Sequence, residues 1–327
     1  MKGWYQRFSW VVLLLPLSWL FQAVARVRRW WLLNHQYAID LPIVVVGNIT
    51  VGGTGKTPLV IYLAKALTAR GLKVAVISRG YKSSVKVLPH HIKDGDLAMQ
   101  VGDEPLLISR HTRVPVVIDS NRVRAVKWIQ ANFACDVIIS DDGLQHYRLK
   151  RDIEIVVIDG VRRFGNGLCL PAGPMREPIS RLQSVDFKVA NGKACAGEVA
   201  MSLRPKALHN LTDYIHSIDV SELVGKTVHA VAGIGYPERF FHTLEQLGAS
   251  IIRHPFEDHH SFVAADLEFT DKHWVVMTEK DAVKCQTFAK SHWWALAVEA
   301  EPDPLLLKEL LVKLMRLLPL HAKLSQK

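Results

Sequence analysis

Short runs of apolar, mostly β-branched residues alternate along the first half of the chain with segments in which apolar residues recur every three or four positions. Runs of the first kind are typical of strands buried on both faces, and segments of the second kind are typical of helices that cover a sheet. The alternation predicts a parallel sheet with helices on both faces. The predicted strands are Ile43–Val46, Val74–Ile77, Val116–Ile118, Val137–Ile139 and Ile155–Ile158, and the predicted helices are Leu59–Ala69, Pro105–His111 and Arg122–Phe133.

A polar stretch near the middle of the chain, Glu198–Leu211, lacks a clear hydrophobic period and is interpreted as an irregular link between two units. At 327 residues the chain is long enough for two domains that each bury a core. We expect a first domain at 31–195, a linker at 196–220 and a smaller α/β domain at 221–327. The elements predicted in the smaller domain are the strands Val228–Val231, Ser250–Arg253, Trp274–Thr278 and Trp294–Val298, the helix Glu238–Leu247, and an amphipathic closing helix, Pro304–Leu317.

Residues 1–30 are interpreted as a membrane-associated helix. Its centre, Ser9–Ala25, is apolar and uncharged, but it is short for a span of about 20 residues and carries Pro16 in its middle. Tryptophans and basic residues near both ends are typical of the headgroup region of an anionic membrane. An anchor that lies in or dips into the bilayer is therefore favoured. A secretory signal that ends at Ala23–Ala25 and a buried core helix are the two alternatives.

The stretch GNITVGGTGKTP, Gly47–Pro58, lies between the first predicted strand and the first predicted helix. Glycines let backbone N–H groups close around an anion, and the start of a helix adds partial positive charge. The stretch is similar to a Walker A loop, except that Thr50 replaces the first glycine. Lys56 would contact the β- and γ-phosphates of ATP, and Thr57 would offer its hydroxyl to Mg²⁺. The predicted nucleotide-binding residues are Thr50, Val51, Gly52, Gly53, Thr54, Gly55, Lys56 and Thr57.

Together with the alternation of strands and helices, this loop predicts an α/β fold class. It consists of a P-loop-type parallel sheet domain with helices on both faces, a second smaller α/β domain, and an N-terminal membrane-associated helix. In such sheets ligands bind at the carboxyl ends of the strands. The polar clusters of the sequence fall at those ends.

Two pairs of carboxylates lie at predicted strand and helix ends. Asp141 and Asp142 follow a strand, where P-loop proteins place the acid that holds Mg²⁺, although an ordinary Asp-Gly turn is the alternative. Asp103 and Glu104 stand at the start of a predicted helix, where capping alone would account for one of them.

Two further segments are rich in polar chemistry. Asp258, His259 and His260 follow the first βαβ unit of the second domain, and a histidine there could act as a base across a cleft. The segment Ile158–Pro178 contains glycines, prolines and three arginines without a regular pattern. Long irregular loops are often functional, and arginines can bind phosphate oxygens with two donors.

Composition narrows the class of partner. The formal net charge of +10 indicates anionic partners, and the absence of a basic run interleaved with aromatics makes nucleic acid the weakest of them. The four cysteines have no CxxC spacing, so the sequence indicates neither a zinc site nor a disulfide framework. No obligate protein partner is expected.

Seven motifs in order resemble the tetraacyldisaccharide 4'-kinase family of lipid A biosynthesis over nearly the whole chain. Any one of them is weak evidence, but seven in the same order are specific. They are GNITVGGTGKTP, ISRGY (Ile77–Tyr81), GDEP (Gly102–Pro105), SDDGLQH (Ser140–His146), FGNGLCLPAGPMREP (Phe164–Pro178), FEDHHSF (Phe256–Phe262) and TEKDAVK (Thr278–Lys284).

The resemblance implies transfer of the γ-phosphate of ATP to the 4'-hydroxyl of a tetraacyldisaccharide 1-phosphate, a lipid A precursor, at the cytoplasmic face of the inner membrane. By resemblance, His259 would take the proton of the sugar hydroxyl and Asp103 would orient it. Thr57, Glu104, Asp141 and Asp142 would organise Mg²⁺. Motif alignment favours His259, and His260 stays open as the base.

Two other functions stay open at this stage. One is a membrane-localised ATPase that acts as a nucleotide switch, which would use the same loop and the same anchor. The other is a soluble kinase of a small metabolite, which the N-terminal segment disfavours. The sequence also leaves open the acyl-chain preference, the oligomeric state, and whether the first helix crosses the bilayer or lies along it.

Overall fold

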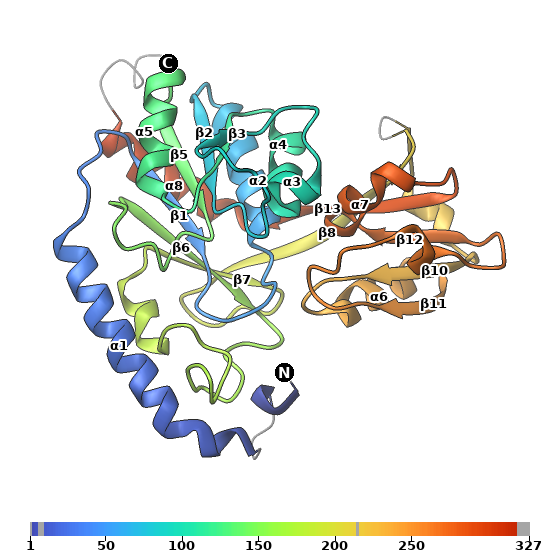
Figure 1. Ribbon diagram of the computed structural model, residues 1–327, viewed down its shortest axis with the longest axis horizontal. Helices are drawn as coiled ribbons and strands as arrows, with labels where there is room; N and C mark the ends of the chain where they lie inside the picture. The colour runs from blue at the N-terminus through green and yellow to red at the C-terminus, as the bar shows by residue number, and fades with distance from the viewer. Residues whose placement is uncertain (1, 6–9, 214–215, 319–327) are drawn as a thin grey trace.

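The computed structural model describes residues 2–5, 10–213 and 216–318. Its centre is one mixed sheet of 13 strands in the order β11-β10-β12-β13-β8-β7-β6-β1-β5-β2-β4-β3, with β9 paired to β8. Figure 1 shows two lobes side by side that share this sheet. The first lobe contains β1 to β7, the second lobe contains β9 to β12, and the long strands β8 and β13 run between them.

The first lobe confirms the predicted parallel sheet. Its neighbouring strands are parallel, except that the short β3 is antiparallel to β4. Its strands are β1 (Ile43–Gly47), β2 (Val74–Ser78), β3 (His90–His91), β4 (Val116–Ile118), β5 (Val137–Asp141), β6 (Ile153–Asp159) and β7 (Phe187–Asn191), and its helices are α2 (Lys56–Thr68), α3 (Ala98–Val101), α4 (Asp103–Thr112), α5 (Arg122–Asn132) and a 3-10 helix, Ile179–Ser184.

Alternation along β1 explains why helices cover both faces. Val44 and Val46 belong to one buried cluster, with side chains of α2 and α4, whereas Ile43 and Val45 belong to a second cluster, with side chains of α5. Successive side chains of a strand point to opposite faces, so an unbroken apolar strand requires a cover on each.

The second lobe is also α/β. Its β10, β11 and β12 are parallel, and β12 is parallel to β13. The elements from β8 onward are β8 (Val199–Asn210), β9 (Ser217–Ile218), β10 (Thr227–Ala232), α6 (Pro237–Gln246), β11 (Ser250–Pro255), β12 (Trp274–Thr278), α7 (Glu279–Cys285), β13 (Trp293–Pro302) and α8 (Pro304–Leu317), with 3-10 helices at Val220–Leu223, Ala264–Leu267 and Gln286–Phe288.

The prediction that Glu198–Leu211 is irregular is wrong. Most of Glu198–Leu211 is the strand β8, which pairs with β7 in the first lobe and, antiparallel, with β13. Polar residues are tolerated because the middle of β8 is only half-buried, and Arg204 and Lys206 form ion pairs with Glu301 on β13. A strand with solvent on one face needs no apolar run.

The last helix also lies elsewhere than expected. α8 was predicted to close the second domain, but Leu306, Leu310 and Leu314 are buried in the same cluster as Val44 and Val46 of β1. β13 returns the chain to the first lobe, so the apolar face of α8 covers the first lobe's sheet.

The N-terminal helix is long and lies mostly outside the folded body. A 3-10 helix, Trp10–Leu14, continues into α1 (Leu15–Asn34), and Pro16 stands in the first turn of α1, where its missing N–H has no helical partner. Another 3-10 helix covers Lys2–Tyr5. Trp10–Asn34 is the helix of the described residues that is long and apolar enough to cross a membrane, with a mean hydropathy of 1.7 in its most apolar window.

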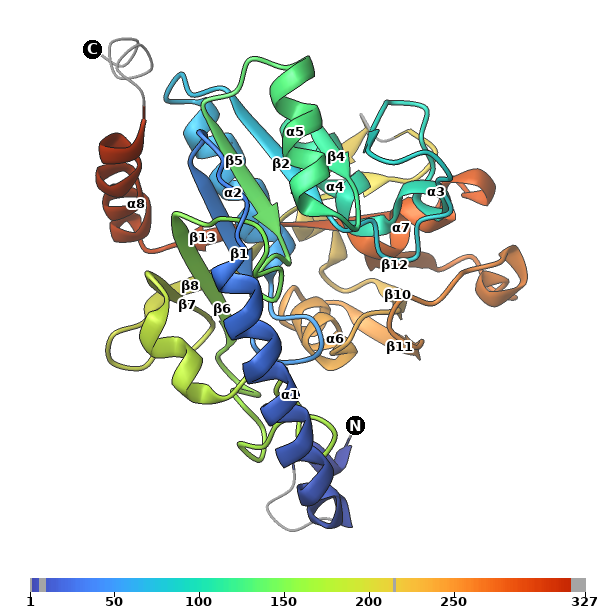
Figure 2. The same ribbon diagram turned by 60° about the vertical axis from the view of Figure 1, so that its left-hand side comes forward.

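The buried-core alternative for this helix is wrong, since only 11% of that window is buried. Figure 2 shows α1 projecting from the first lobe. An apolar stripe, called here the α1 stripe, is exposed at intervals of three and four residues and comprises Trp10, Leu13, Leu17, Leu20, Val24, Val27 and Trp31. Such a stripe is compatible with membrane association.

Truncation of Leu310 tests the position of α8. Leu310 is fully buried, so Leu310→Ala should cost about 2–5 kcal/mol of unfolding free energy, measured by urea unfolding. Val312→Ala is the matched control on the exposed side of the same helix and should cost less than about 0.5 kcal/mol. Equal effects of the two changes would contradict the packing of α8.

Candidate functional site

The glycine loop between β1 and α2 has a backbone conformation in which residues other than glycine would be strained. Gly52 and Gly55 have φ of 98° and 94°, and a Cβ on Gly55 would lie 2.6 Å from the Asn191 amide nitrogen. Asn191 donates to the Thr54 carbonyl over 3.1 Å and so holds the loop in place. Positive φ in this position is the geometry of anion-binding loops that end at a helix N-terminus.

Two cavities meet at this loop. The larger, about 750 Å³, extends from α1 across the glycine loop to the second lobe, and the smaller, about 370 Å³, lies between the loop and the second lobe. Of the predicted nucleotide-binding residues, Thr50 lines neither cavity; it is buried and pairs with Met175. The other seven line one cavity or both and are Val51, Gly52, Gly53, Thr54, Gly55, Lys56 and Thr57.

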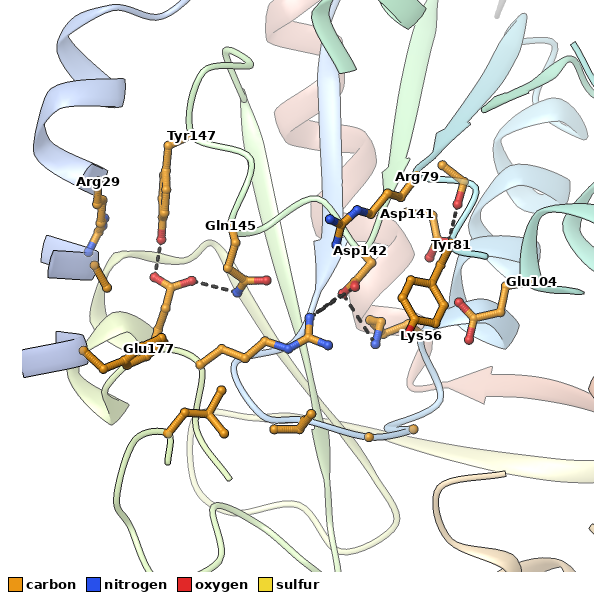
Figure 3. Close-up of a pocket in the computed structure, with 18 of the residues that line it drawn as sticks. Arg29, Lys56, Arg79, Tyr81, Glu104, Asp141, Asp142, Gln145, Tyr147 and Glu177 are labelled. Carbon is orange, nitrogen blue, oxygen red and sulfur yellow. Dashed lines mark hydrogen bonds and ion pairs between the residues drawn. The ribbon is translucent and has the colours of Figure 1, made fainter. Parts of the chain in front are cut away.

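Carboxylates crowd together where the two cavities meet. Asp141 and Asp142 come from the end of β5, and Glu104 comes from the start of α4 (Figure 3). Burial and the charges of Glu104 and Asp142 raise the pKa of Asp141 to about 7. Asp142 behaves in the opposite way: burial alone would raise its pKa, but Lys56 at 3.5 Å and Arg176 at 3.2 Å outweigh burial and lower it to about 2.

This cluster suits a divalent cation whose coordination is completed by the nucleotide. The Oδ1 atom of Asp141 is buried without a hydrogen-bond partner, whereas its Oδ2 atom accepts from Ser78 over 3.1 Å. Among the described residues, no three His, Cys, Asp or Glu side chains are arranged to hold a metal by themselves. Mg²⁺ commonly takes only one or two carboxylates together with nucleotide phosphates and water, so the donor set suits Mg²⁺ bound with ATP.

Asp103 and His259 meet across the lobes. Their Oδ2 and Nδ1 atoms are 3.1 Å apart, although the residues are 156 positions apart in the chain. Asp103 is buried; burial alone would raise its pKa, but the hydrogen bond from His259 and the charge of Lys280 lower it to about 2. The other Asp103 oxygen accepts from the Glu104 N–H, so the carboxylate is held by an amide of the first turn of α4 while it orients the imidazole.

His260 points to a different partner. Its Nε2 lies 3.0 Å from Asp266, and its ring packs against Phe256 and Phe262 in the second lobe. It lines neither cavity, whereas His259 lines the larger. The geometry therefore supports His259 over His260 as the base.

The motif TEKDAVK contains a site residue that the sequence analysis did not single out. Lys280 lies 3.0 Å from Glu104, 3.6 Å from Asp258 and 3.2 Å from Nε2 of His259. Two other charged residues of the motif are structural: Asp281 accepts from the Gly233 N–H, and Lys284 pairs with Asp281. Lys280 follows the carboxyl end of β12, and that position in a parallel sheet is a signal that could have found it.

The arginines of Ile158–Pro178 divide between two tasks. This segment contains no α-helix or strand after Asp159, as expected. Arg176 reaches Asp142 in the site, and Arg162 donates to the Gly53 carbonyl while it pairs with Asp159. Arg163 instead pairs with Glu198, away from the cavities.

A chain of polar contacts, buried at Tyr147 and Glu177, links the glycine loop to α1. Gln145 donates to the Asn48 carbonyl and to Glu177, and Glu177 accepts from the Tyr147 hydroxyl (Figure 3). Arg29 of α1 stands 5.2 Å from the centre of the Tyr147 ring. The wall of the larger cavity is thus tied to the exposed helix, and no pattern in the sequence indicated this connection.

Comparisons of the sequence and of the structure with known proteins point to one family. The sequence model of the family described as LpxK, tetraacyldisaccharide-1-P 4'-kinase, matches residues 10–316. Proteins named tetraacyldisaccharide 4'-kinase are similar: that of Ectopseudomonas mendocina is 48% identical over 98% of this chain and 97% of its own length, and that of Legionella pneumophila strain Corby is 49% identical over 91% and 92%. A crystal structure described as the "apo" form of LpxK from Aquifex aeolicus in complex with ATP has a TM-score of 0.78 at 25% identity, covering 95% of this chain and 100% of that one.

Asp141→Asn tests the crowding of carboxylates. The raised pKa of Asp141 means that its charged form is disfavoured on folding, so stability falls as pH rises from about 4 to about 7. At pH 8 without metal, Asp141→Asn should therefore raise the melting temperature by several degrees, measured by circular dichroism. Asp142→Asn should lower it, because Lys56 and Arg176 would lose their partner. The same sign for both changes would contradict the assignment.

Proposed function

The chain belongs to the tetraacyldisaccharide-1-P 4'-kinase family, and from that premise we propose how its two cavities divide the reaction. The reaction is the ATP-dependent phosphorylation of the 4'-hydroxyl of a tetraacyldisaccharide 1-phosphate. ATP occupies the smaller cavity, with its phosphates on the glycine loop and its base among apolar side chains of the second lobe and of β13. Those side chains are Ile234, Tyr236, Phe240, Leu296 and Val298.

The lipid acceptor occupies the larger cavity. One wall of that cavity is α1, including Phe21 and Val24, and the other reaches His259. An acyl chain suits the apolar wall, and the sugar suits the polar end. Arg26, Arg28 and Arg29 line the same cavity and carry charge that suits the acceptor's phosphate.

The single observation that supports this reaction best is the Asp103–His259 pair at the end of the larger cavity. A sugar hydroxyl is a poor nucleophile at neutral pH, so it needs a base. With Nδ1–H donating to Asp103, Nε2 of His259 takes the hydroxyl proton while the oxygen attacks the γ-phosphorus. Asp103 keeps the imidazole in this tautomer and stabilises the imidazolium that forms. A nucleotide switch would need neither this pair nor a cavity that reaches α1.

Charge neutralisation is shared among several groups of the chain. Lys56 lies at the start of α2, where it faces the β- and γ-phosphates, and Arg176 faces the same space from the arginine-containing loop. Thr57, Glu104, Asp141 and Asp142 would hold Mg²⁺. Bound there, Mg²⁺ would neutralise charge on the phosphates during transfer.

The α1 stripe attaches the enzyme to the cytoplasmic face of the inner membrane, where both ATP and the lipid are accessible. Apart from Val24, which borders the larger cavity, the residues of the stripe line neither cavity, so the helix can lie in the headgroup region while its other side meets the substrate. Trp19 and Trp30 are exposed next to the stripe and suit the same depth.

His259→Ala tests the base. Transfer of labelled γ-phosphate to the purified lipid should fall by about 10²–10⁴-fold, because the hydroxyl loses its proton acceptor. The affinity for ATP should change little, since His259 lines only the larger cavity. His260→Ala is the matched control and should keep transfer within about threefold. The assignment is wrong if His260→Ala is the variant that loses transfer.

The double variant Leu20→Glu with Val27→Glu tests the α1 stripe. Both side chains are exposed and line neither cavity, so the fold and the site should be retained. Binding to anionic phospholipid vesicles, measured by sedimentation, should fall at least about tenfold, because charge is costly at the apolar boundary. Val312→Glu, which introduces the same side chain at an exposed position of α8, is the matched control. Unchanged vesicle binding by the double variant would refute the proposed attachment.

A further inference from the structure

Of the residues that the structure describes, five line both cavities, and two of these are cationic: Lys56 of the glycine loop and Lys280 of the second lobe. The other three are Gly53, Glu104 and Asp258. If the cavities hold ATP and the acceptor as proposed, the γ-phosphate and the hydroxyl must meet among these five. Lys280 thus stands at the point of transfer, although it belongs to the other lobe and to no phosphate-binding loop.

Lys280 is held as a charged ammonium. Its side chain is only 19% exposed, and it forms ion pairs with Glu104 at 3.0 Å and with Asp258 at 3.6 Å, which keep it charged. An ammonium has three donors and no acceptor. Its contact of 3.2 Å with Nε2 of His259 is therefore a hydrogen bond that Lys280 donates.

This bond fixes the state of the base. Nε2 of His259 accepts from Lys280, so the ring proton is on Nδ1, which faces Asp103 at 3.1 Å. The tautomer is the one that catalysis requires, but the Nε2 lone pair that must take the hydroxyl proton is occupied. The structure shows an oriented base that is not yet accessible to a substrate.

We propose that Lys280 is a nucleotide-operated switch on the base: it covers Nε2 of His259 in the free enzyme and moves to the γ-phosphate when Mg²⁺ and ATP bind. The γ-phosphate oxygens carry charge and compete for the ammonium better than a neutral imidazole nitrogen. Mg²⁺ would also draw Glu104 away from Lys280 and weaken the contact that holds the ammonium beside the ring.

The released base then completes a balanced transfer. The acceptor oxygen forms a bond to the γ-phosphorus while the bond from that phosphorus to the β–γ bridging oxygen breaks. The hydroxyl proton moves to Nε2 of His259, and ADP leaves with the bridging oxygen and its charge. Before ATP binds, the covered nitrogen cannot activate water or the lipid, so Lys280 couples base activity to nucleotide occupancy. This inference rests on the proposed function of the two cavities.

The test compares ATP with ADP. In Lys280→Met, the affinity for ATP should fall by about 10- to 100-fold, since one charged hydrogen bond to the γ-phosphate is lost. The affinity for ADP, measured by the same calorimetry, should change less than about threefold, because ADP has no γ-phosphate. Lys280→Arg should restore part of the preference for ATP. A purely structural lysine would affect both nucleotides equally.

Lys284→Met is the matched control, because Lys284 lies one turn along α7, pairs with Asp281 and the His260 carbonyl, packs over Phe262 and lines neither cavity. It removes the same charge and should keep the ratio of ATP to ADP affinity. Nitrogen NMR of ¹⁵N-histidine-labelled protein gives a second readout: the His259 Nε2 signal, assigned by its loss in His259→Ala, should shift with a nonhydrolysable ATP analogue and Mg²⁺. It should not shift with ADP.

An unchanged ATP-to-ADP ratio in Lys280→Met, or an Nε2 signal that is indifferent to the ATP analogue, would overturn the proposal. Failure of the proposed function is distinguishable. If the wild-type protein transferred no phosphate to the lipid, the assignment of the two cavities to ATP and the acceptor would be wrong. The calorimetry and the NMR signal would still decide whether Lys280 binds the γ-phosphate.

Discussion

Three carboxylates, those of Glu104, Asp141 and Asp142, come together beside the glycine loop, with Asp103 next to Glu104, and the repulsion among the three is the constraint that the site must satisfy. Buried like charges are tolerated only when cations or protons balance them. Lys56 and Arg176 balance Asp142, Lys280 balances Glu104, and Asp103 accepts a hydrogen bond from His259. Asp141 is left with an unpaired oxygen and a raised pKa, which suits a metal ion that arrives with its substrate.

The cations that balance these carboxylates come from both lobes. The positions of the two lobes relative to each other therefore decide whether the site is complete. One helix of the first lobe, α4, meets the second lobe at both ends: Asp103 faces His259, Glu104 faces Lys280, and His111 lies 2.8 Å from Glu279. The antiparallel strands β8 and β13 join the lobes within one sheet. The hydrogen-bonded pairing of these two strands, rather than an irregular linker, fixes how far His259 and Lys280 lie from the glycine loop.

Much of the fold was predictable because its signals are local. The apolar runs of β1 and β5 and the helical spacing of α2 and α6 depend on residues close in sequence, and all were found at the expected positions. The failures concern pairing partners. β8 is polar because one side of it is exposed, and α8 covers the first lobe because β13 carries the chain back there. Neither fact is a property of the segment itself.

The sequence by itself determined the chemical inventory: a glycine loop that precedes Lys56 and Thr57, acids at strand and helix ends, histidines in the second unit, and an apolar N-terminal helix. Tertiary structure alone decided which of these groups meet. His259 and His260 are adjacent in the chain, yet only His259 reaches Asp103, because neighbouring side chains point in different directions. The place of Lys280 after a strand is a local signal, but its partners are not, since Glu104 and His259 come from distant segments that only the assembled sheet brings together.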